Sequence, residues 1–434
     1  MPQLFYPFPA CLLAATALLA TGCHRQYRLL NDDLTPIKPL PTRKQLMMPL
    51  PMIERTRSFD SNPGFDTAYI EFNDRGRLFD PLPNRHQVDA TLALIRRTKP
   101  SNVVLYVHGW NNNSSEDSAD VARFRFALSF LSRRLRPQGQ LLGIYIGWRG
   151  GTLKGGVLGP FTFLTYWSRK QGARRMAYGD LTKIIDELLE STRVAQPDRR
   201  FYTIGHSFGA RVLEGALQDS SHFKTFFDAL EGKNKGVQLP IDLVLLINPA
   251  TDSMLTKRLV KRAGKLGEES NLEIKHPDWN EDFCRDNPAH RKCRPYPLMV
   301  EMSSRGDIPT RWVMPVANFV NWVPPFLFLA RPSARLLSAP FTPSLRTHSL
   351  RSCGYDPCGA QNGKTEFDFD MPASPLKNNQ PLRRRLDRLD GKSPFVWALT
   401  VDRELSRNHG DVWNGNVAAM MFALIDPDGE QTYT

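Results

Sequence analysis

One stretch near the middle of the chain, Arg200–Leu217 (RFYTIGHSFGARVLEGAL), constrains the fold more than any other. It begins with a short apolar run rich in strand-forming residues and ends with apolar residues at helical spacing. Between them stands GHSFG, residues 205–209, which has the G-x-S-x-G form of a nucleophile elbow. In an elbow the serine backbone is strained, so the positions two residues before and after it must be glycine. The stretch predicts that Ser207 stands exposed beside a helix N-terminus, where developing negative charge is stabilised. The alternative is a tight turn whose serine has no chemical role.

Strand-like apolar runs alternate with helical patterns over most of the chain. This alternation predicts an α/β fold, with a mainly parallel sheet flanked by helices and joined by right-handed crossovers. At 434 residues, the chain is expected to form one large domain with insertions. Strands are predicted at Thr67–Phe72, Val103–Val107, Leu141–Trp148, Leu243–Ile247, Leu298–Met302 and Phe395–Val401, and helices at Val88–Arg97, Val121–Leu131, Met176–Leu189 and Val417–Ile425.

An activated serine needs a general base and an acid that orients this base. If these groups follow the elbow in the order serine, acid, histidine, the acid comes after a later strand. Asp307 follows the predicted strand Leu298–Met302 and is the favoured acid. Asp252, after the strand Leu243–Ile247, is the alternative acid, and a turn-capping role for Asp307 is the structural alternative.

Two histidines follow Asp307 in the chain, His348 and His409. His348 lies beside a pair of cysteines and away from any predicted strand end. His409 lies in the loop between the last predicted strand and the last predicted helix, where the general base belongs. We therefore predict His409 as the base.

The strand Val103–Val107 runs into His108-Gly109-Trp110. A glycine lets the backbone turn there, so the N–H of Trp110, together with that of Phe208, is expected to form an oxyanion hole. His108 and His206 are expected to be structural hydrogen-bonding and packing residues.

From about Thr67 to Ile425 the chain resembles the α/β-hydrolase superfamily, specifically bacterial serine esterases and lipases with an exported lipoprotein anchor. The HGWN segment and the GHSFG elbow carry this resemblance, and the acid and histidine loops match in order and context. It implies hydrolysis of a carboxylic ester, lipid and acyl esters included, through a Ser-His-Asp triad and an acyl-enzyme intermediate, with no metal and no organic cofactor. The alternative is a non-catalytic envelope lipoprotein that uses the fold as a binding or scaffold module. Peptidase and thioesterase activities are alternatives among enzymes.

The N-terminus predicts export and lipid attachment. The apolar core at residues 12–20 is short for a membrane span and leads into Ala20-Thr21-Gly22-Cys23. This motif resembles the lipobox of bacterial lipoprotein signal peptides, although residues 1–22 contain no Lys or Arg. We predict a signal peptide over 1–22, palmitate-type acylation of Cys23, a Pro-rich basic tether over 23–63 and the hydrolase domain over 64–434. The protein would then be a lipid-anchored protein of the bacterial cell envelope, in the outer membrane and facing the periplasm. An uncleaved anchor and an ordinary secretory signal are the alternatives.

Four further cysteines fall as two close pairs in loop-like segments, as disulfides do in an oxidising compartment. Zinc is the competing explanation, but the spacings C-x8-C and C-x4-C do not match standard zinc sites. The predicted disulfides are Cys284–Cys293 and Cys353–Cys358.

The formal net charge of +13 admits anionic partners. No nucleic-acid-binding motif accompanies it, so an anionic lipid surface is the favoured partner and no nucleic acid is expected. Insertions are predicted at about 149–175, 253–297 and 311–392. The stretches 149–175 and 311–351 are aromatic and basic without an acidic residue, which is typical of either a membrane-facing lid or a buried hydrophobic subdomain.

Overall fold

A computed structural model defines the fold. The structure describes residues 26–30, 50–56, 64–79, 85–135, 140–150, 166–195, 198–231, 240–251, 253, 256–261, 281–286, 296–314, 337–354, 364–371, 382–388, 396–413, 417, 420–421 and 424–425.

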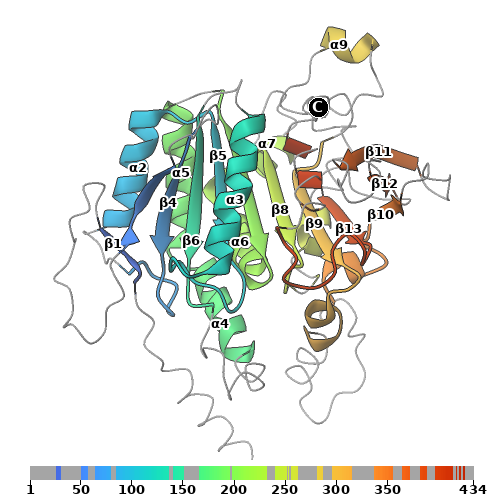
Figure 1. The fold of residues 1–434 in the computed structure, drawn as a ribbon, viewed down its shortest axis with the longest axis horizontal. Helices are drawn as coiled ribbons and strands as arrows, with labels where there is room; N and C mark the ends of the chain where they lie inside the picture. Colours follow the sequence, from blue (N-terminus) through green and yellow to red (C-terminus); the bar gives the residue numbers. More distant parts are fainter. Residues whose placement is uncertain are drawn as a thin grey trace, which may run out of the picture.

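Eleven strands form one sheet in the order β11-β12-β10-β13-β9-β8-β7-β5-β6-β4-β3 (Figure 1). The strands from β10 to β4 in this order run parallel, whereas β3 at one edge and β12 near the other run antiparallel to their neighbours. The predicted α/β fold with a mainly parallel sheet is therefore confirmed. The strands are β3 (Ile53–Thr56), β4 (Phe65–Glu71), β5 (Asn102–Val107), β6 (Leu141–Gly147), β7 (Arg200–His206), β8 (Leu243–Ile247), β9 (Met299–Ser304), β10 (His348–Gly354), β11 (Lys364–Met371), β12 (Leu382–Arg388) and β13 (Val396–Val401).

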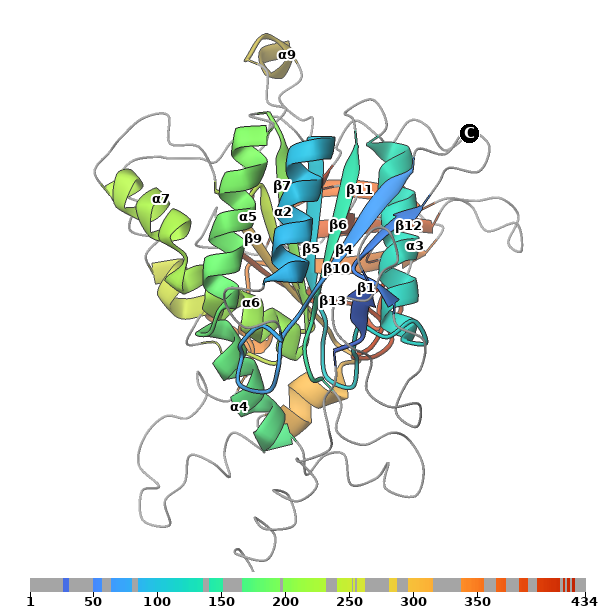
Figure 2. The same ribbon diagram turned by 90° about the vertical axis from the view of Figure 1, so that its left-hand side faces the viewer.

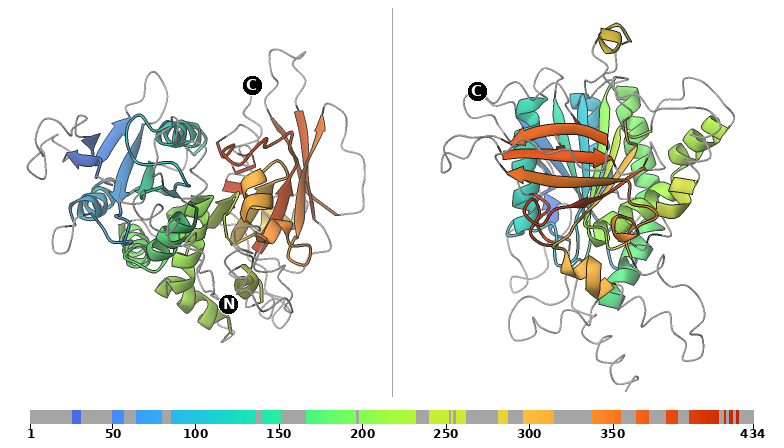
Figure 3. Two further views of the ribbon diagram at one scale, coloured as in Figure 1. Left: turned by 90° about the horizontal axis from the view of Figure 1, so that it is seen from below. Right: turned by 90° about the vertical axis from the view of Figure 1, so that its right-hand side faces the viewer.

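Helices cover both faces of the sheet. Figure 3 shows α3 on one face, with α2, α5 and α6 on the other. The strands between these layers are buried on both sides, which explains why residues 103–107 of β5 and the whole of β8 are continuous apolar runs. The helices are α2 (His86–Thr98), α3 (Ala119–Arg134), α4 (Tyr166–Ala177), α5 (Leu181–Ala195), α6 (Phe208–Asp219), α7 (Ser221–Glu231) and α9 (Glu281–Asp286), with a π-helical turn at Pro309–Val313 and a 3-10 turn at Ala339–Phe341.

The helix predicted at Met176–Leu189 is in fact two helices. Helix α4 ends at Ala177 and α5 begins at Leu181, after a three-residue turn. Helix α5 buries Leu181, Ile184, Ile185, Leu188 and Leu189, whose spacing places them on one face. The apolar period of α5 was visible in the sequence, but the turn before it carries no proline and interrupts the pattern for only three residues.

The predicted tether over 23–63 is partly folded. Residues Arg28–Leu30 form β1, which pairs in parallel with β2 (Leu50–Pro51), and β3 pairs with β4 at the edge of the main sheet (Figure 2). The prediction of an extended tether is therefore wrong for residues 28–30 and 50–56. These strands are short and carry no periodic pattern, so only their pairing with distant residues reveals them.

Arg28 explains why this N-terminal segment is held against the domain. Its side chain is completely buried, and its guanidinium lies 3.7 Å above the ring of Tyr69 and pairs with Glu54. Arg28 Nε donates to the carbonyl of Ser114 at 2.9 Å, and the Arg28 backbone N–H donates to the carboxylate of Glu71 at 2.9 Å. A buried charge persists only when it is paired and hydrogen-bonded in this way.

Part of the predicted basic, membrane-facing stretch 149–175 points inward. Arg149 and Arg169 are 6% and 3% exposed and pair with Asp74 at 2.5 and 3.1 Å. Arg175 donates to the carbonyl of Asp74 at 2.8 Å. Arg169 and Arg175 connect α4 to the turn after β4, and Arg149 pairs with the same turn from the segment after β6. The two buried arginines, Arg149 and Arg169, are not available to lipid headgroups, whereas Arg175 is exposed. Residues 151–165 lie outside the described part of the chain.

The predicted insertion 311–392 contains β10, β12 and β11, which extend the main sheet beyond β13 (Figure 1). It is therefore an extension of the sheet rather than only a lid. Its aromatic segment 315–336, and most of the predicted insertion 253–297, lie outside the described residues.

Residues 1–25, with the predicted signal peptide and Cys23, lie outside the described residues. Among the helices that the structure does describe, none combines the length and apolarity needed to cross a bilayer. Cys284 in α9 forms a disulfide. Its predicted partner Cys293, and the predicted partner of Cys353, Cys358, are outside the described residues, so both pairings stay predictions.

Candidate functional site

The GHSFG segment forms the sharp turn between β7 and α6. Ser207 has φ 55° and ψ −120°, a conformation that residues with a side chain rarely adopt. A Cβ on Gly209 would lie 2.1 Å from the carbonyl oxygen of Val107, and one on Gly205 would lie 2.6 Å from Cα of Ala210. Only glycine fits at either position, as the elbow prediction required.

Three predicted site residues meet at this turn. Ser207 Oγ lies 2.6 Å from Nε2 of His409, and Nδ1 of the same ring lies 3.0 Å from both carboxylate oxygens of Asp307. With the ring proton on Nδ1, the histidine donates to Asp307 and accepts from the serine hydroxyl. The three residues come from the ends of β7, β9 and β13, which are brought together although 202 positions separate Ser207 from His409.

Ser207 is less accessible than predicted, because only 2% of its surface is exposed. The His409 ring covers the hydroxyl, and the backbone of Gly109 packs against the other side. A methyl group on Gly109 would lie 2.9 Å from Cβ of Ser207. The described part of the chain therefore encloses the serine between the β5 loop and the β13 loop.

Asp307 is completely buried in the turn after β9, and its carboxylate is well supplied with donors. Oδ1 accepts the backbone N–H of Thr310 at 3.0 Å, and Oδ2 accepts the hydroxyl of Thr310. These bonds fix the carboxylate plane that faces His409. Asp252 lies outside the described residues.

The role of Thr310 was not predicted from the sequence. An Asp followed three residues later by a Thr, with Pro309 between them at the start of a helical turn, is a capping pattern that could have been recognised.

The β5 loop lies where the oxyanion hole was predicted. Trp110 follows the end of β5, and its ring packs edge-on against Phe208, with 6.2 Å between the ring centroids. Phe208 is the first residue of α6, where backbone N–H groups have no acceptor within the helix. Asn111 has φ 65° and donates to the carbonyl of Gly150 at 3.0 Å, which fixes the loop after Trp110.

His108 has a structural environment, as expected. It is fully buried, its Nε2 accepts the backbone N–H of Trp148 at 3.0 Å, and its ring stacks on Trp148 at a centroid distance of 5.7 Å. His348 lies at the start of β10, buried against the ring of Trp397 at 4.4 Å. The structure brings neither ring into hydrogen-bond contact with Ser207.

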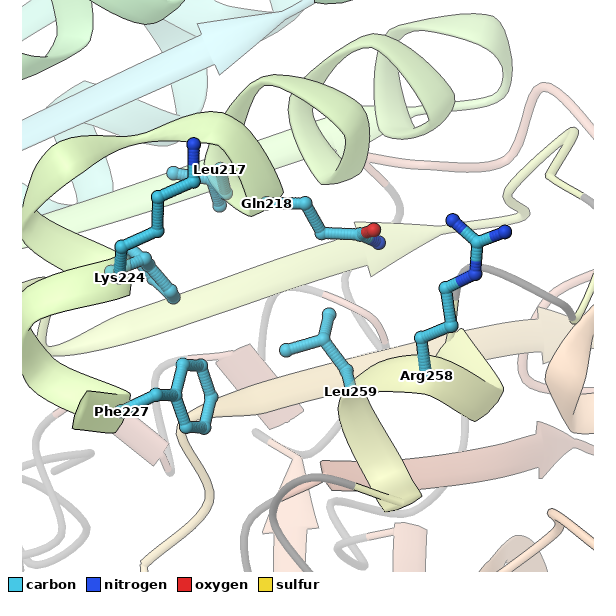
Figure 4. A pocket seen from close by; sticks show the side chains of 7 residues that line it. Leu217, Gln218, Lys224, Phe227, Arg258 and Leu259 are labelled. Carbon is cyan, nitrogen blue, oxygen red and sulfur yellow. The ribbon is translucent and has the colours of Figure 1, made fainter. Parts of the chain in front are cut away.

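A cavity of about 130 Å³ lies away from these residues. Figure 4 shows it between the end of α6, α7 and the segment that carries Arg258 and Leu259. Leu217, in its lining, follows Ser207 by ten residues along α6, which corresponds to about 15 Å. The cavity is therefore not a binding pocket for a group that reacts at Ser207. Within the described residues, no group of His, Cys, Asp and Glu side chains is arranged to hold a metal ion.

No protein-family model matches the chain, and no curated protein matches it. Among solved structures, it is similar to a cutinase from Trichoderma reesei in complex with a C11Y4 phosphonate inhibitor. The two chains share 17% identity, and the alignment covers 38% of this chain and 66% of the cutinase chain, just under two thirds. The TM-score of 0.19 is too low for the likeness to support an argument about activity.

Proposed function

We propose that this protein is a serine hydrolase that cleaves carboxylic esters, with Ser207 as nucleophile, His409 as general base and Asp307 as the acid that orients the base. The observation that supports this proposal is the continuous hydrogen-bonded row from Ser207 Oγ through the His409 ring to the Asp307 carboxylate. The strained backbone of Ser207 supports it as well, because such strain persists where function requires it.

In the acylation step, Ser207 Oγ attacks the ester carbonyl carbon while its proton passes to Nε2 of His409. The buried carboxylate of Asp307 stabilises the imidazolium that forms. Negative charge develops on the carbonyl oxygen, and the backbone N–H groups of Trp110 and Phe208 are the proposed donors to it. When the intermediate collapses, the leaving alkoxide takes the proton from the imidazolium, and the acyl group stays on Ser207.

In the deacylation step, water replaces the alcohol. The water oxygen attacks the acyl carbon while His409 takes one proton from the water. His409 then returns this proton to Ser207 Oγ as the carboxylic acid leaves. Neither step needs a metal or an organic cofactor. The proposal places the chain among the α/β-hydrolase esterases that its elbow and HGWN segment resemble, with esters of acyl chains or lipids as candidate substrates.

A fluorophosphonate probe tests this function directly, because it reacts only with an activated serine. The wild-type protein should be labelled, and Ser207→Ala should not. Ser221→Ala, which removes an exposed hydroxyl on α7 away from the site, is the matched control and should label as the wild type does. Labelling that survives Ser207→Ala would exclude this nucleophile. A wild-type protein that is not labelled and hydrolyses no ester would instead favour the non-catalytic scaffold.

We also propose that Cys23 carries the lipid anchor, at the bacterial cell envelope with the domain facing the periplasm. The small residues before Cys23 support this proposal. Metabolic labelling with a palmitate analogue should modify the wild-type protein and not Cys23→Ser. Label retained on the variant would exclude Cys23.

A further inference from the structure

The loop that carries His409 is held by side chains at the ends of three neighbouring strands. This loop, residues 402–411, follows β13 and contains neither helix nor strand. A general base must keep its ring within a fraction of an ångström of the nucleophile. The position of this ring therefore depends on what fixes the loop backbone.

The backbone carbonyl of His409 accepts two hydrogen bonds. Nε2 of His206 donates to it at 2.9 Å, and Nδ2 of Asn248 donates to it at 2.9 Å. His206 is the residue before the nucleophile, and Asn248 directly follows β8. A carbonyl oxygen has two lone pairs, so these two donors fill its capacity and fix its direction.

Asn248 is itself fixed in place. It has φ 45°, a conformation that asparagine tolerates better than most residues, and it is 1% exposed. Its Oδ1 accepts the backbone N–H of Ser304 at 2.9 Å, and its own N–H donates to the carbonyl of Met302 at 2.7 Å. One amide group therefore connects the end of β9, which leads to Asp307, with the loop that carries His409.

Ser304 adds a third connection. Its hydroxyl donates to the carbonyl of Ser406, and the same oxygen accepts the backbone N–H of Gly306 at 3.0 Å. The acid-bearing turn and the base-bearing loop are thus bonded to each other besides the contact between Asp307 and His409.

We propose that His206 and Asn248 are positioning residues, whose donors to the His409 carbonyl hold the imidazole between Ser207 and Asp307. This inference rests on the proposed ester hydrolysis and assigns a task to two residues that do not touch the reacting atoms. His206 donates its hydrogen bond to the His409 carbonyl as a neutral imidazole. Burial, together with the nearby His409 ring at 5.1 Å, lowers the pKa of His206 to about 3, so the ring does not add a positive charge beside the base.

Three substitutions test the two donors. His206→Phe keeps the ring and removes the donor, whereas His206→Gln removes the ring and keeps an N–H donor near the position of Nε2. Asn248→Asp keeps the acceptor for Ser304 and replaces the donor with an oxygen that faces the His409 carbonyl. His222→Phe is the matched control, because His222 lies on α7 and contacts Asp186 rather than the site.

We expect His206→Phe and Asn248→Asp to lower kcat for a p-nitrophenyl ester by about 10- to 100-fold, with KM changed less than about twofold, because substrate binding is intact and the base is misplaced. His206→Gln should recover kcat to within about threefold of the wild type. The double variant His206→Phe with Asn248→Asp should be less impaired than the product of the two single effects, since both donors act on one carbonyl.

Amide hydrogen exchange gives a readout that does not depend on activity. Exchange at residues 405–411 should rise in His206→Phe and Asn248→Asp, but not in His206→Gln or His222→Phe. A folded His206→Phe with wild-type kcat, or a His206→Gln as impaired as His206→Phe, overturns the inference. If the wild-type protein hydrolyses no ester and escapes the fluorophosphonate probe, the proposed function fails. In that case unchanged exchange shows separately that the carbonyl contacts do not hold the loop.

Discussion

The strain at Ser207 predicts an unusual stability effect. Ser207→Ala and Ser207→Gly both remove the hydroxyl and its bond to His409, and they differ only in the presence of Cβ. The observed φ of 55° and ψ of −120° are the mirror image of an ordinary extended conformation, which glycine adopts freely. We therefore expect Ser207→Gly to be more stable than Ser207→Ala, the reverse of the usual order.

The magnitude follows from two opposing terms. A side chain held in such a region costs about 1–3 kcal/mol, which glycine recovers. Glycine also makes the unfolded chain more flexible, which costs about 0.4–1 kcal/mol. The expected net difference in the free energy of unfolding is about 1 kcal/mol in favour of Ser207→Gly. The matched control is Ala122→Gly, at an exposed position in α3, which should lose about 1 kcal/mol.

Urea unfolding at 25 °C, followed by tryptophan fluorescence, measures this difference. With an m value of about 3 kcal/mol/M, the midpoint of Ser207→Gly should lie about 0.3 M above that of Ser207→Ala. A Ser207→Gly midpoint below that of Ser207→Ala would refute the reasoning, because it would mean that the backbone at Ser207 is relaxed.

Three further predictions concern buried ionisable groups. Asp307→Asn should leave the fold intact and lower kcat about a thousandfold or more, because an amide favours the wrong tautomer of His409. Circular dichroism checks the fold, and steady-state kinetics with a p-nitrophenyl ester measures kcat. Arg28→Met should cost about 1–3 kcal/mol in urea unfolding, because the carbonyl of Ser114 loses a buried donor and Glu54 keeps only its pair with Arg125, and an unchanged midpoint would contradict this role of Arg28. Burial raises the pKa of Glu301 to about 7, so the native state binds a proton that the unfolded chain releases near pH 4.5. The stabilisation is complete below pH 4.5 and is lost as pH rises through 7, so the urea midpoint should fall less between pH 5 and 8 in Glu301→Gln than in the wild-type protein.

The strands and helices of the central sheet could be predicted because the pattern that identifies them is local. Strands such as Val103–Val107 and Leu243–Ile247 are apolar throughout, since helices cover both faces of the sheet. The order of the candidate site residues could be predicted for a related reason: the strands are parallel, so their following loops meet at one edge of the sheet. Ser207, Asp307 and His409 could therefore be predicted from the sequence as the candidate site residues.

The missed strands of the main sheet are β3 at one end and β10, β11 and β12 at the other, and their local pattern is weak. Strand β12, with the sequence LRRRLDR, has four arginines in seven residues and gives no sign of a buried face. Its pairing with β10 and β11 depends on residues far from it in the chain, and no local rule describes that choice.

The contacts of the positioning residues were missed for the same reason, since they join residues that are far apart in the chain. Asn248 and His206 act on the His409 carbonyl from 161 and 203 residues away, and their residue types do not distinguish them from turn and packing residues. A polar residue at the end of a parallel strand is a weak signal alone. When three successive parallel strands are each followed or ended by a polar residue, however, these side chains meet at one edge of the sheet. Such a set predicts hydrogen bonds among the loops at that edge.

The buried Arg28 changes what a lipid anchor would do. A free tether of about forty residues would let the domain explore a wide volume above a membrane. Arg28 follows Cys23 by only five residues, and an extended chain of that length spans at most about 18 Å. An acyl chain on Cys23, as proposed above, would therefore hold the surroundings of Arg28 close to the bilayer. Arg28 donates to the carbonyl of Ser114, in the loop that follows β5 and contains the candidate oxyanion residue Trp110. The edge of the sheet that carries Ser207 would then be the edge held toward the membrane, so an ester in the membrane could reach it without a mobile tether.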